Sequence, residues 1–411
     1  MAIKSFTPEY FVSQAEMNSV FIQDYLQSFI PPQNIDLTNG TVFNFIIRER
    51  AHKKKINPVI RKATFKDIEE IIYIYQDIYE GSYPYKEMED PENIKAMLES
   101  ENVEWLMFEH PKTREICGCF TLVLDFKDKM GYTRGFVIKK KFCGKFDVLR
   151  AFMASFLAMY LKYEDKIFRW YGESRTAHAK SQYCMRPGGF RPVAFYPNKD
   201  LFFHKVESDI LLMCYDSSAL GELRSKKFPH IIKEALPAFN YSNAKYLLGD
   251  YEIFQGSLHL DSKYLIALQK KLRTEVVKNK YGYEEICFRI EGSDAFFSFL
   301  YTPMVQNLEK TQYHVNSNEE LFVFGQEFIR YARKLKLRYF EVFVKAYRPE
   351  HQQIFFDLGF NVNGYVPSWK FNESERKFED YILFNYNLGE IDPDIQLLEE
   401  GRMLLEKLGY M

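Results

Sequence analysis

The sequence predicts a mixed α/β fold in which one strand–helix–hairpin unit occurs twice. Residues 131–162 have the pattern of a buried strand, a short basic loop with one glycine, and a long amphipathic helix. A closing signature that begins at Gly189 recurs at Gly359, with the same order of glycine, aromatic residue, proline and apolar strand. Because both the order and the spacing are repeated, the two segments indicate two copies of one supersecondary unit.

The bulk properties exclude several classes of function. A chain of 411 residues predicts two or three domains of roughly 150 residues each. The net charge of −1 gives no general attraction to nucleic acid or to an anionic membrane, so neither partner is expected. No apolar run of about 18 residues and no secretory segment are found, which favours a cytoplasmic protein. The six cysteines show no metal-ligand spacing and are interpreted as packing thiols, so no metal is expected.

The first 58 residues are expected to form an N-terminal helical extension. Met17, Val20, Phe21, Tyr25 and Phe29 lie on one helical stripe that two prolines stop, and residues 41–47 have strand character. From Val59 the pattern is a strand, a turn with Thr64 as N-cap, and a helix with isoleucines at helical spacing. Two further strands are expected over residues 104–109 and 116–125, joined by a turn.

The basic loop after the strand at residues 133–138 predicts an anion site. A helix N-terminus presents backbone N–H groups without intrahelical partners, so a phosphate can be held there largely by the main chain. Gly144 allows close approach of that main chain, and Lys141 and Lys145 add positive charge. The alternative is a plain strand–helix turn with solvated lysines, in which Cys143 is inert.

This loop resembles the acyl-CoA pyrophosphate loop of the GNAT superfamily of N-acetyltransferases, whose pattern is Arg/Gln-x-x-Gly-x-Gly/Ala. Lys141 stands for the first residue and Gly144 for the first glycine, whereas Phe146 replaces the final small residue. The strand, Ala63-Thr64-x-x-Asp67 and helix also resemble the GNAT opening. The resemblance implies acetyl-CoA, or another acyl-CoA, as cofactor. It implies cofactor contacts at Phe136, Val137, Ile138, Lys141, Cys143, Gly144, Lys145, Phe146 and Ser181.

Residues 168–174 form a candidate strand followed by a helix, then Gly189-Phe190 and a closing hairpin. In the family this strand parts from the central strand and opens a V for the pantetheine arm. The family's helix carries an Asn and a Tyr at positions that here hold His178 and Met185. Tyr183 is two residues out of register, so the usual tyrosine acid is not carried over.

The second copy has no glycine between Tyr301 and Phe324, so we expect no second acyl-CoA loop there. We expect helices at residues 223–235 and 261–278 of the linker, and a tail helix over 392–408 that docks onto its own domain. The predicted division is 1–58 extension, 59–215 first GNAT-like domain, 216–283 mostly helical linker, 284–390 second GNAT-like domain, and 391–411 C-terminal helix.

Amide formation from a thioester needs a base for the amine and polarisation of the thioester carbonyl. Glu173 is the first candidate base, His178 the second, and Tyr183 or Tyr85 candidate acids. Each has a structural alternative: Glu173 could pair with Arg175 or Arg134, His178 could cap a turn, and the tyrosines could pack.

The sequence therefore predicts an N-acyltransferase, most simply an N-acetyltransferase, acting on a primary amine of a small molecule or protein. A tandem GNAT-fold protein that binds acyl-CoA or a partner without turnover is the alternative. A third hypothesis, an aminoacyl-tRNA donor, is disfavoured because no basic surface is indicated.

Overall fold

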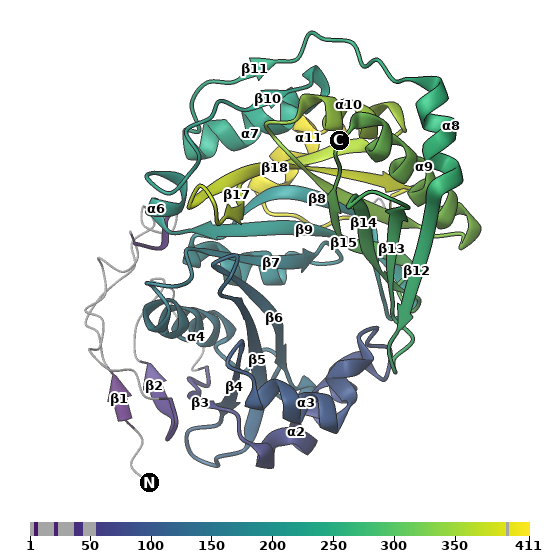
Figure 1. Ribbon diagram of the computed structural model, residues 1–411. Coiled ribbons are helices and arrows are strands. Elements are labelled where there is room, and N and C mark those ends of the chain that lie inside the picture. The colour runs from purple at the N-terminus through teal and green to yellow at the C-terminus, as the bar shows by residue number, and fades with distance from the viewer. Residues whose placement is uncertain (1–3, 7–19, 24–36, 44–54, 392–393) are drawn as a thin grey trace.

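A single mixed sheet of 16 strands runs through the computed structural model, with helices on both of its faces (Figure 1). The structure describes residues 4–6, 20–23, 37–43, 55–391 and 394–411. Two parts of the sheet are called here the first half, residues 59–215, and the second half, residues 272–387. The fold class expected from the sequence, mixed α/β, is confirmed.

The first half contributes seven consecutive strands to the sheet, and β1 and β2 extend it at the outer edge. The edge strands are β1 (Lys4–Phe6) and β2 (Thr41–Phe43). The strands of the first half are β3 (Val59–Lys62), β4 (Val103–Glu109), β5 (Ile116–Asp125), β6 (Met130–Ile138), β7 (Arg169–Arg175), β8 (Arg191–Phe202) and β9 (Lys205–Tyr215). Its helices are α2 (Ile68–Tyr79), α3 (Pro91–Glu99), α4 (Val148–Lys162) and α5 (Lys180–Met185).

The linker and the second half follow. The linker contains α6 (Ser217–Leu220), β10 (His230–Ile231), α7 (Leu236–Tyr246), β11 (Glu252–Ile253) and α8 (Ser262–Lys271). The second half contains β12 (Leu272–Lys278), β13 (Glu284–Ile290), β14 (Phe296–Thr302), β15 (Asn307–His314), α9 (Asn318–Lys334), β16 (Tyr339–Lys345), α10 (Pro349–Asp357), β17 (Asn361–Asn372) and β18 (Lys377–Asn387). The chain ends with α11 (Glu399–Lys407).

The two halves have the same order of strands. The first reads β3-β4-β5-β6-β7-β9-β8, and the second reads β12-β13-β14-β15-β16-β18-β17. In each half the fourth and fifth strands pair in parallel, and the neighbouring pairs are antiparallel. In each half a long helix joins the fourth strand to the fifth, as a parallel crossover requires. This helix is α4 in the first half and α9 in the second.

Local backbone irregularities are repeated as well. The fourth strand of each half carries a one-residue bulge, where Gly135 and Lys310 have φ values of 61° and 57°. Strands β8 and β17 bend after a proline, where Asn198 and Ser368 have φ values of 55° and 51°. These bends explain why the proline recurs in both copies of the closing signature.

The halves join edge to edge through β8 and β17. Ala194 pairs with Gly364, and these two residues are separated by the same interval as the repeated glycines Gly189 and Gly359. A Cβ on Gly364 would lie 2.2 Å from the Cβ of Ala194, so the close approach requires a glycine. Contacts across the junction are reciprocal: Arg169 donates to the Ser368 carbonyl, and Arg338 Nε donates to the Asn198 carbonyl at 2.8 Å.

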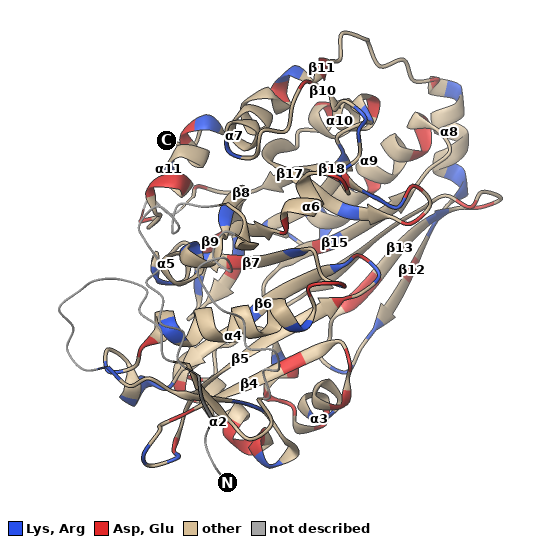
Figure 2. Cartoon of the chain, turned by 90° about the vertical axis from the view of Figure 1, so that its left-hand side faces the viewer, with Lys and Arg blue, Asp and Glu red and all other residues tan. Residues whose placement is uncertain are grey.

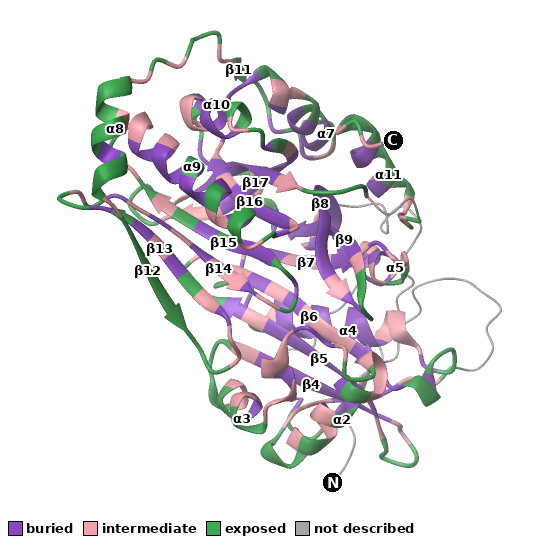
Figure 3. Cartoon of the chain, turned by 90° about the vertical axis from the view of Figure 1, so that its right-hand side faces the viewer, coloured by how far each residue is buried: buried purple, intermediate pink, exposed green. Residues whose placement is uncertain are grey.

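Burial follows this arrangement (Figure 3). The strands around the junction, including β7, β8, β9 and β17, are mostly buried, whereas the far edge strand β12 is mostly exposed. The hydrophobic core therefore continues across the junction, where residues of β8 and β9 pack with residues of the second half.

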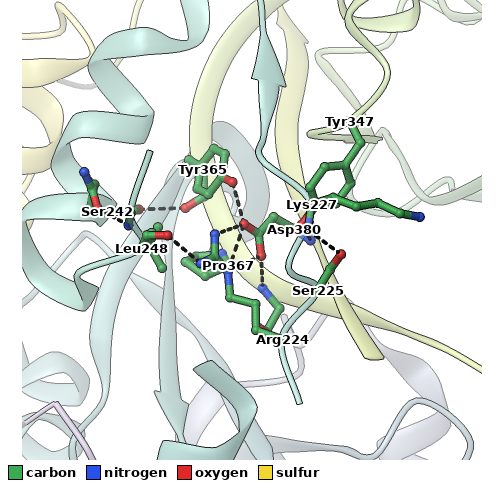
Figure 4. Close-up of polar contacts among 12 residues, drawn as sticks. Arg224, Ser225, Lys227, Ser242, Leu248, Tyr347, Tyr365, Pro367 and Asp380 are labelled. Carbon is green, nitrogen blue, oxygen red and sulfur yellow. Dashed lines mark hydrogen bonds and ion pairs between the residues drawn. The ribbon is translucent and has the colours of Figure 1, made fainter. Parts of the chain in front are cut away.

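A buried ion pair ties the linker to the second half (Figure 4). The Arg224 guanidinium lies 2.5 Å from Asp380 on β18 and also donates to the Leu248 carbonyl at 2.7 Å. Asp380 additionally accepts from the Tyr365 hydroxyl at 2.5 Å and from the Ser368 N–H at 2.9 Å. Both charges are thus hydrogen-bonded, which a buried pair needs in order to be stable.

Three sequence predictions in the linker and the tail are wrong. Residues 223–235, expected to be a helix, form the short strand β10 and a single 3₁₀ turn at Lys233–Ala235 instead. The helix expected over residues 261–278 ends at Lys271, and the β-branched stretch that follows forms β12 on the edge of the second half. The tail helix packs against the first half: Leu404 and Leu405 of α11 lie in the core that α4 covers, and the Gln396 N–H donates to the Thr176 carbonyl at 2.7 Å.

The predicted N-terminal helical extension lies largely outside the described residues. Within them, Ile22 is buried and Phe21 forms a parallel bridge with Tyr215 of β9. Of the strand expected over residues 41–47, the structure describes β2, Thr41–Phe43.

Candidate functional site

The basic loop before α4 is bonded to the chain that precedes β3. The Ile56 N–H donates to the Lys145 carbonyl at 2.8 Å, and the Asp147 N–H donates to the Ile56 carbonyl at 2.9 Å. The N–H groups of Lys145 and Phe146 donate back to the Phe142 carbonyl. Three amides that a phosphate would use are therefore already hydrogen-bonded within the protein.

The start of α4 also carries its own anion. Asp147 is the N-cap residue, and its carboxylate accepts from the Arg150 N–H at 3.2 Å. A carboxylate at this position is stabilised by the helix dipole in the way a bound phosphate would be. Two lysines of the loop likewise have carboxylate partners, since Lys140 pairs with Glu80 and Lys141 with Glu115.

Phe146 fills the core beneath the loop and does not cover the helix terminus. Its side chain is 1% exposed, and its ring centroid lies 5.8 Å from that of Phe108. Gly144 has a φ of 77° and open space where a Cβ would be, so this part of the loop faces outward. Cys143 is exposed beside it, with its thiol near the carbonyls of Ile138 and Lys139.

The strands β6 and β7 part as the resemblance implies. They pair in parallel only from Met130 to Tyr132, and Gly135 then adds its bulge to β6. Beyond the bulge, Phe136 packs among other phenylalanines, whereas Val137 and Ile138 remain paired with β5. The cofactor candidates Phe136, Val137 and Ile138 thus lie on the strand that diverges from β7.

The candidate catalytic residues lie on different sides of β7. Ser174 faces α5, where its hydroxyl lies 2.5 Å from that of Ser181. Tyr183 packs against the core on that same side, and burial lowers the pKa of His178 at the start of the connection to α5. Glu173 points to the opposite face of β7, because successive residues of a strand alternate.

Glu173 is bonded to a buried lysine. The Lys199 ammonium lies 2.8 Å from a Glu173 oxygen and 3.5 Å from a Glu309 oxygen. The Lys199 side chain is 1% exposed, whereas that of Glu173 is 21% exposed. Lys199 comes from the bend of β8 and Glu309 from β15, so the two halves meet at this cluster.

Further carboxyl groups surround Lys199, and we call Glu173, Lys199, Asp200, Asp209, Glu309 and Glu341 the junction cluster. Burial lowers the pKa of Lys199, but Glu173, Glu341 and Glu309 together raise it well above its usual value. Burial raises the pKa of Glu341 to about 7 against the opposing charge of Lys199. Burial raises the pKa values of Asp200 and Asp209, which share a hydrogen bond, and the negative charge of neighbouring carboxylates such as Glu173 adds to the rise in both.

Tyrosines and one arginine connect the junction cluster to the bulge of β6. Tyr132 and Tyr171 stack with centroids 4.4 Å apart, and the Arg134 guanidinium lies 5.9 Å from the Tyr132 ring and 5.7 Å from the Tyr85 ring. The Tyr85 hydroxyl donates to Asp200 at 3.1 Å. The loop at residues 80–85, which carries the candidate acid Tyr85, therefore lies against the same cluster as Glu173.

Sequence reasoning missed Lys199, Glu309 and Glu341. One signal was present: Asn198, Lys199 and Asp200 interrupt the apolar closing strand with consecutive polar residues. Nothing in the sequence places the second half's glutamates beside Lys199, since that proximity comes from the packing of the halves. Charged residues on the central strands, including β7 and β15, are visible in Figure 2.

A separate hollow of about 680 Å³ lies at the other end of the first half, between the ends of α3 and α4. Its buried carboxylate, Glu104, accepts from Tyr163 and pairs with Lys62 at 2.9 Å and with Lys162. The hollow adjoins the entry of β6, away from the loop at its exit, so it takes no part in the site described above.

Comparisons with known proteins find acetyltransferases of similar structure. No protein-family model and no curated protein matches the chain. A dodecameric spermidine N-acetyltransferase from Vibrio cholerae aligns with 40% of this chain and 97% of its own, at 11% identity and a TM-score of 0.34. A ribosomal-protein-S5-alanine acetyltransferase from Vibrio fischeri aligns with 41% of this chain and 96% of its own, at 15% identity and a TM-score of 0.34.

Both structural neighbours are acetyltransferases of the GNAT fold. Within the described residues, no helix combines the length and the apolar content that crossing a bilayer requires.

Proposed function

We propose that the chain is an N-acyltransferase of the GNAT type, built as a tandem in which the first half binds acetyl-CoA or another acyl-CoA. One observation carries this proposal: β6 bulges at Gly135, parts from β7, and leads through a basic loop into α4, within the strand order β3-β4-β5-β6-β7-β9-β8. The repeated strand order, bulge and proline bend of the second half support the tandem.

The proposed reaction needs few groups from the protein. An acceptor ammonium would give one proton to Glu173, and its nitrogen would then attack the thioester carbonyl. The C–N bond would form, the C–S bond would break, and CoA would leave as the thiol after taking up the second proton that the nitrogen loses as it becomes an amide. Main-chain N–H groups near the bulge would stabilise the charge that develops on the carbonyl oxygen. Glu173 is our base because, of the two candidate bases, it alone lies on the face where Tyr85, Tyr132 and Tyr171 gather.

A second candidate function is binding of acyl-CoA or a partner without turnover, and the hydrogen bonds of the loop bear on it. The amides of Lys145, Phe146 and Asp147 are already hydrogen-bonded, and the Asp147 carboxylate caps α4. A diphosphate would have to displace the contacts of Ile56, or be held by the exposed lysine side chains instead. In the second half, Ser317 and Glu320 cap α9 in the same way, so we propose no acyl-CoA site there.

Titration calorimetry of the full chain with acetyl-CoA tests the proposal. We expect binding that Lys141→Glu together with Lys145→Glu weakens at least about tenfold, because two cations beside a diphosphate are replaced by anions. Lys263→Glu with Lys270→Glu, on the exposed α8, is the matched control. Absence of binding for acetyl-CoA and longer acyl-CoA thioesters would refute both candidate functions.

A further inference from the structure

Lys199 links the proposed base to the second half. Its ammonium bonds to Glu173 of β7 at 2.8 Å and reaches Glu309 of β15 at 3.5 Å. The backbone places it there: the positive-φ bend at Asn198 is fixed by hydrogen bonds from its N–H to Ser208 and from Arg338 to its carbonyl. The ammonium is therefore held by both halves at once.

The carboxylates around Lys199 compete for one cation. Glu173 and Glu309 both contact it, Glu341 lies in the same cluster, and these three come from both halves. A lysine with 1% of its side chain exposed cannot turn to water for its remaining hydrogen bonds. The positive charge of Lys199 is thus shared between Glu309 and Glu173.

We propose that Lys199 is a positioning residue that fixes the orientation of the Glu173 carboxylate and offsets its negative charge, and that the second half tunes this effect through Glu309. The inference rests on the proposed acyl transfer with Glu173 as base. It gives the second half a role in the reaction even though no acyl-CoA loop is proposed for it.

The test compares pH profiles of kcat/KM for acetyl-CoA and one primary amine, chosen as the most active in a panel. Lys199→Met removes the cation that lies beside the Glu173 carboxylate, so the acid limb of the profile is expected to move up by about one pH unit. Glu309→Gln removes the competitor, so the acid limb is expected to move down. Because the amine is the same in every assay, its own protonation cancels from the comparison.

A merely structural role of Lys199 would not shift the acid limbs of Lys199→Met and Glu309→Gln in opposite directions. Lys199→Arg should restore a profile near that of the unmodified chain, since it keeps the charge. Glu285→Gln, an exposed glutamate of β13, is the control and should leave the profile unchanged. If Lys199→Met does not fold, the Glu309→Gln and Lys199→Arg profiles decide the question.

Failure of this inference and failure of the proposed function give different results. An unmodified chain that releases no CoA with any amine contradicts the function itself. An active chain whose acid limb does not move in Glu309→Gln, or moves in the same direction in both Lys199→Met and Glu309→Gln, overturns the role of Lys199 and leaves the transferase standing.

Discussion

Individual residues of the junction cluster make the stability of the fold depend on pH. The pKa of Glu341 is about 7 in the folded protein, against an ordinary value of 4.5, because its side chain is buried. The folded state therefore binds more protons at this site than the unfolded state between these two values. The resulting stabilisation is complete below about pH 4.5 and is lost as the pH rises toward 7.

Glu341→Gln should remove this dependence while keeping the shape of the side chain. We expect the free energy of unfolding of the variant to fall less between pH 5 and 7 than that of the unmodified chain, by about 1–3 kcal/mol. Urea unfolding at several pH values measures this difference. If the free energy of unfolding changes with pH by the same amount in the two proteins, Glu341 is ionised throughout this range.

The buried Arg224–Asp380 pair predicts a large single-residue effect (Figure 4). Asp380→Asn leaves a buried guanidinium without its counter-charge, so we expect a loss of about 3–5 kcal/mol in the free energy of unfolding. Glu375→Gln, which breaks the exposed pair with Lys227, should cost less than about 1 kcal/mol. Equal losses in chemical denaturation would contradict the assignment of Asp380 as a buried anchor.

At the level of elements, the tail helix α11 carries a prediction that the sequence alone could not give. Leu405 is 1% exposed and packs in the core of the first half. Leu405→Ala should destabilise the protein by about 2–5 kcal/mol through loss of burial and a residual cavity. Met403→Ala, half exposed on the same helix, is the control, and a similar loss for both variants would contradict the docking.

Elements with a strong local pattern were predictable, and those decided by packing were not. The helix after Thr64 and the strand–loop–helix around Gly144 follow from periodicity and turn residues, and the structure forms both. Strand β12 could not be predicted, because no glycine or proline separates it from the helix that precedes it. The docking of α11 depends on contacts between segments more than 200 residues apart, such as Gln396 with Thr176.

The candidate site divides in the same way. Glu173 and the loop at residues 139–146 could be selected from their neighbours in sequence, because a motif and a resemblance point to them. The partners that give Glu173 its surroundings could not, since Lys199 lies on a bend of β8 and Glu309 on the second half. The self-bonded state of the loop was equally hidden, because Ile56 approaches it from a part of the chain some 90 residues earlier.

For the whole molecule, the central feature is the junction at which Ala194 meets Gly364. Its reciprocal contacts place the face of β6 and β7 in the first half opposite β15 and β16 of the second. An acyltransferase site at this place would be composite, with the acyl donor on one half and part of the acceptor's surroundings on the other. This explains why a second half without a proposed acyl-CoA loop of its own would still matter for the reaction.

The transferase assignment is tested most directly by measuring how fast the full chain releases CoA thiol from acetyl-CoA. The assay is run with each amine of a panel of primary amines. The account predicts amine-dependent release that Glu173→Gln lowers at least about a hundredfold in kcat, as expected for loss of a general base. Glu285→Gln should retain full activity. Release that no amine stimulates, or that Glu173→Gln leaves unchanged, would contradict the account.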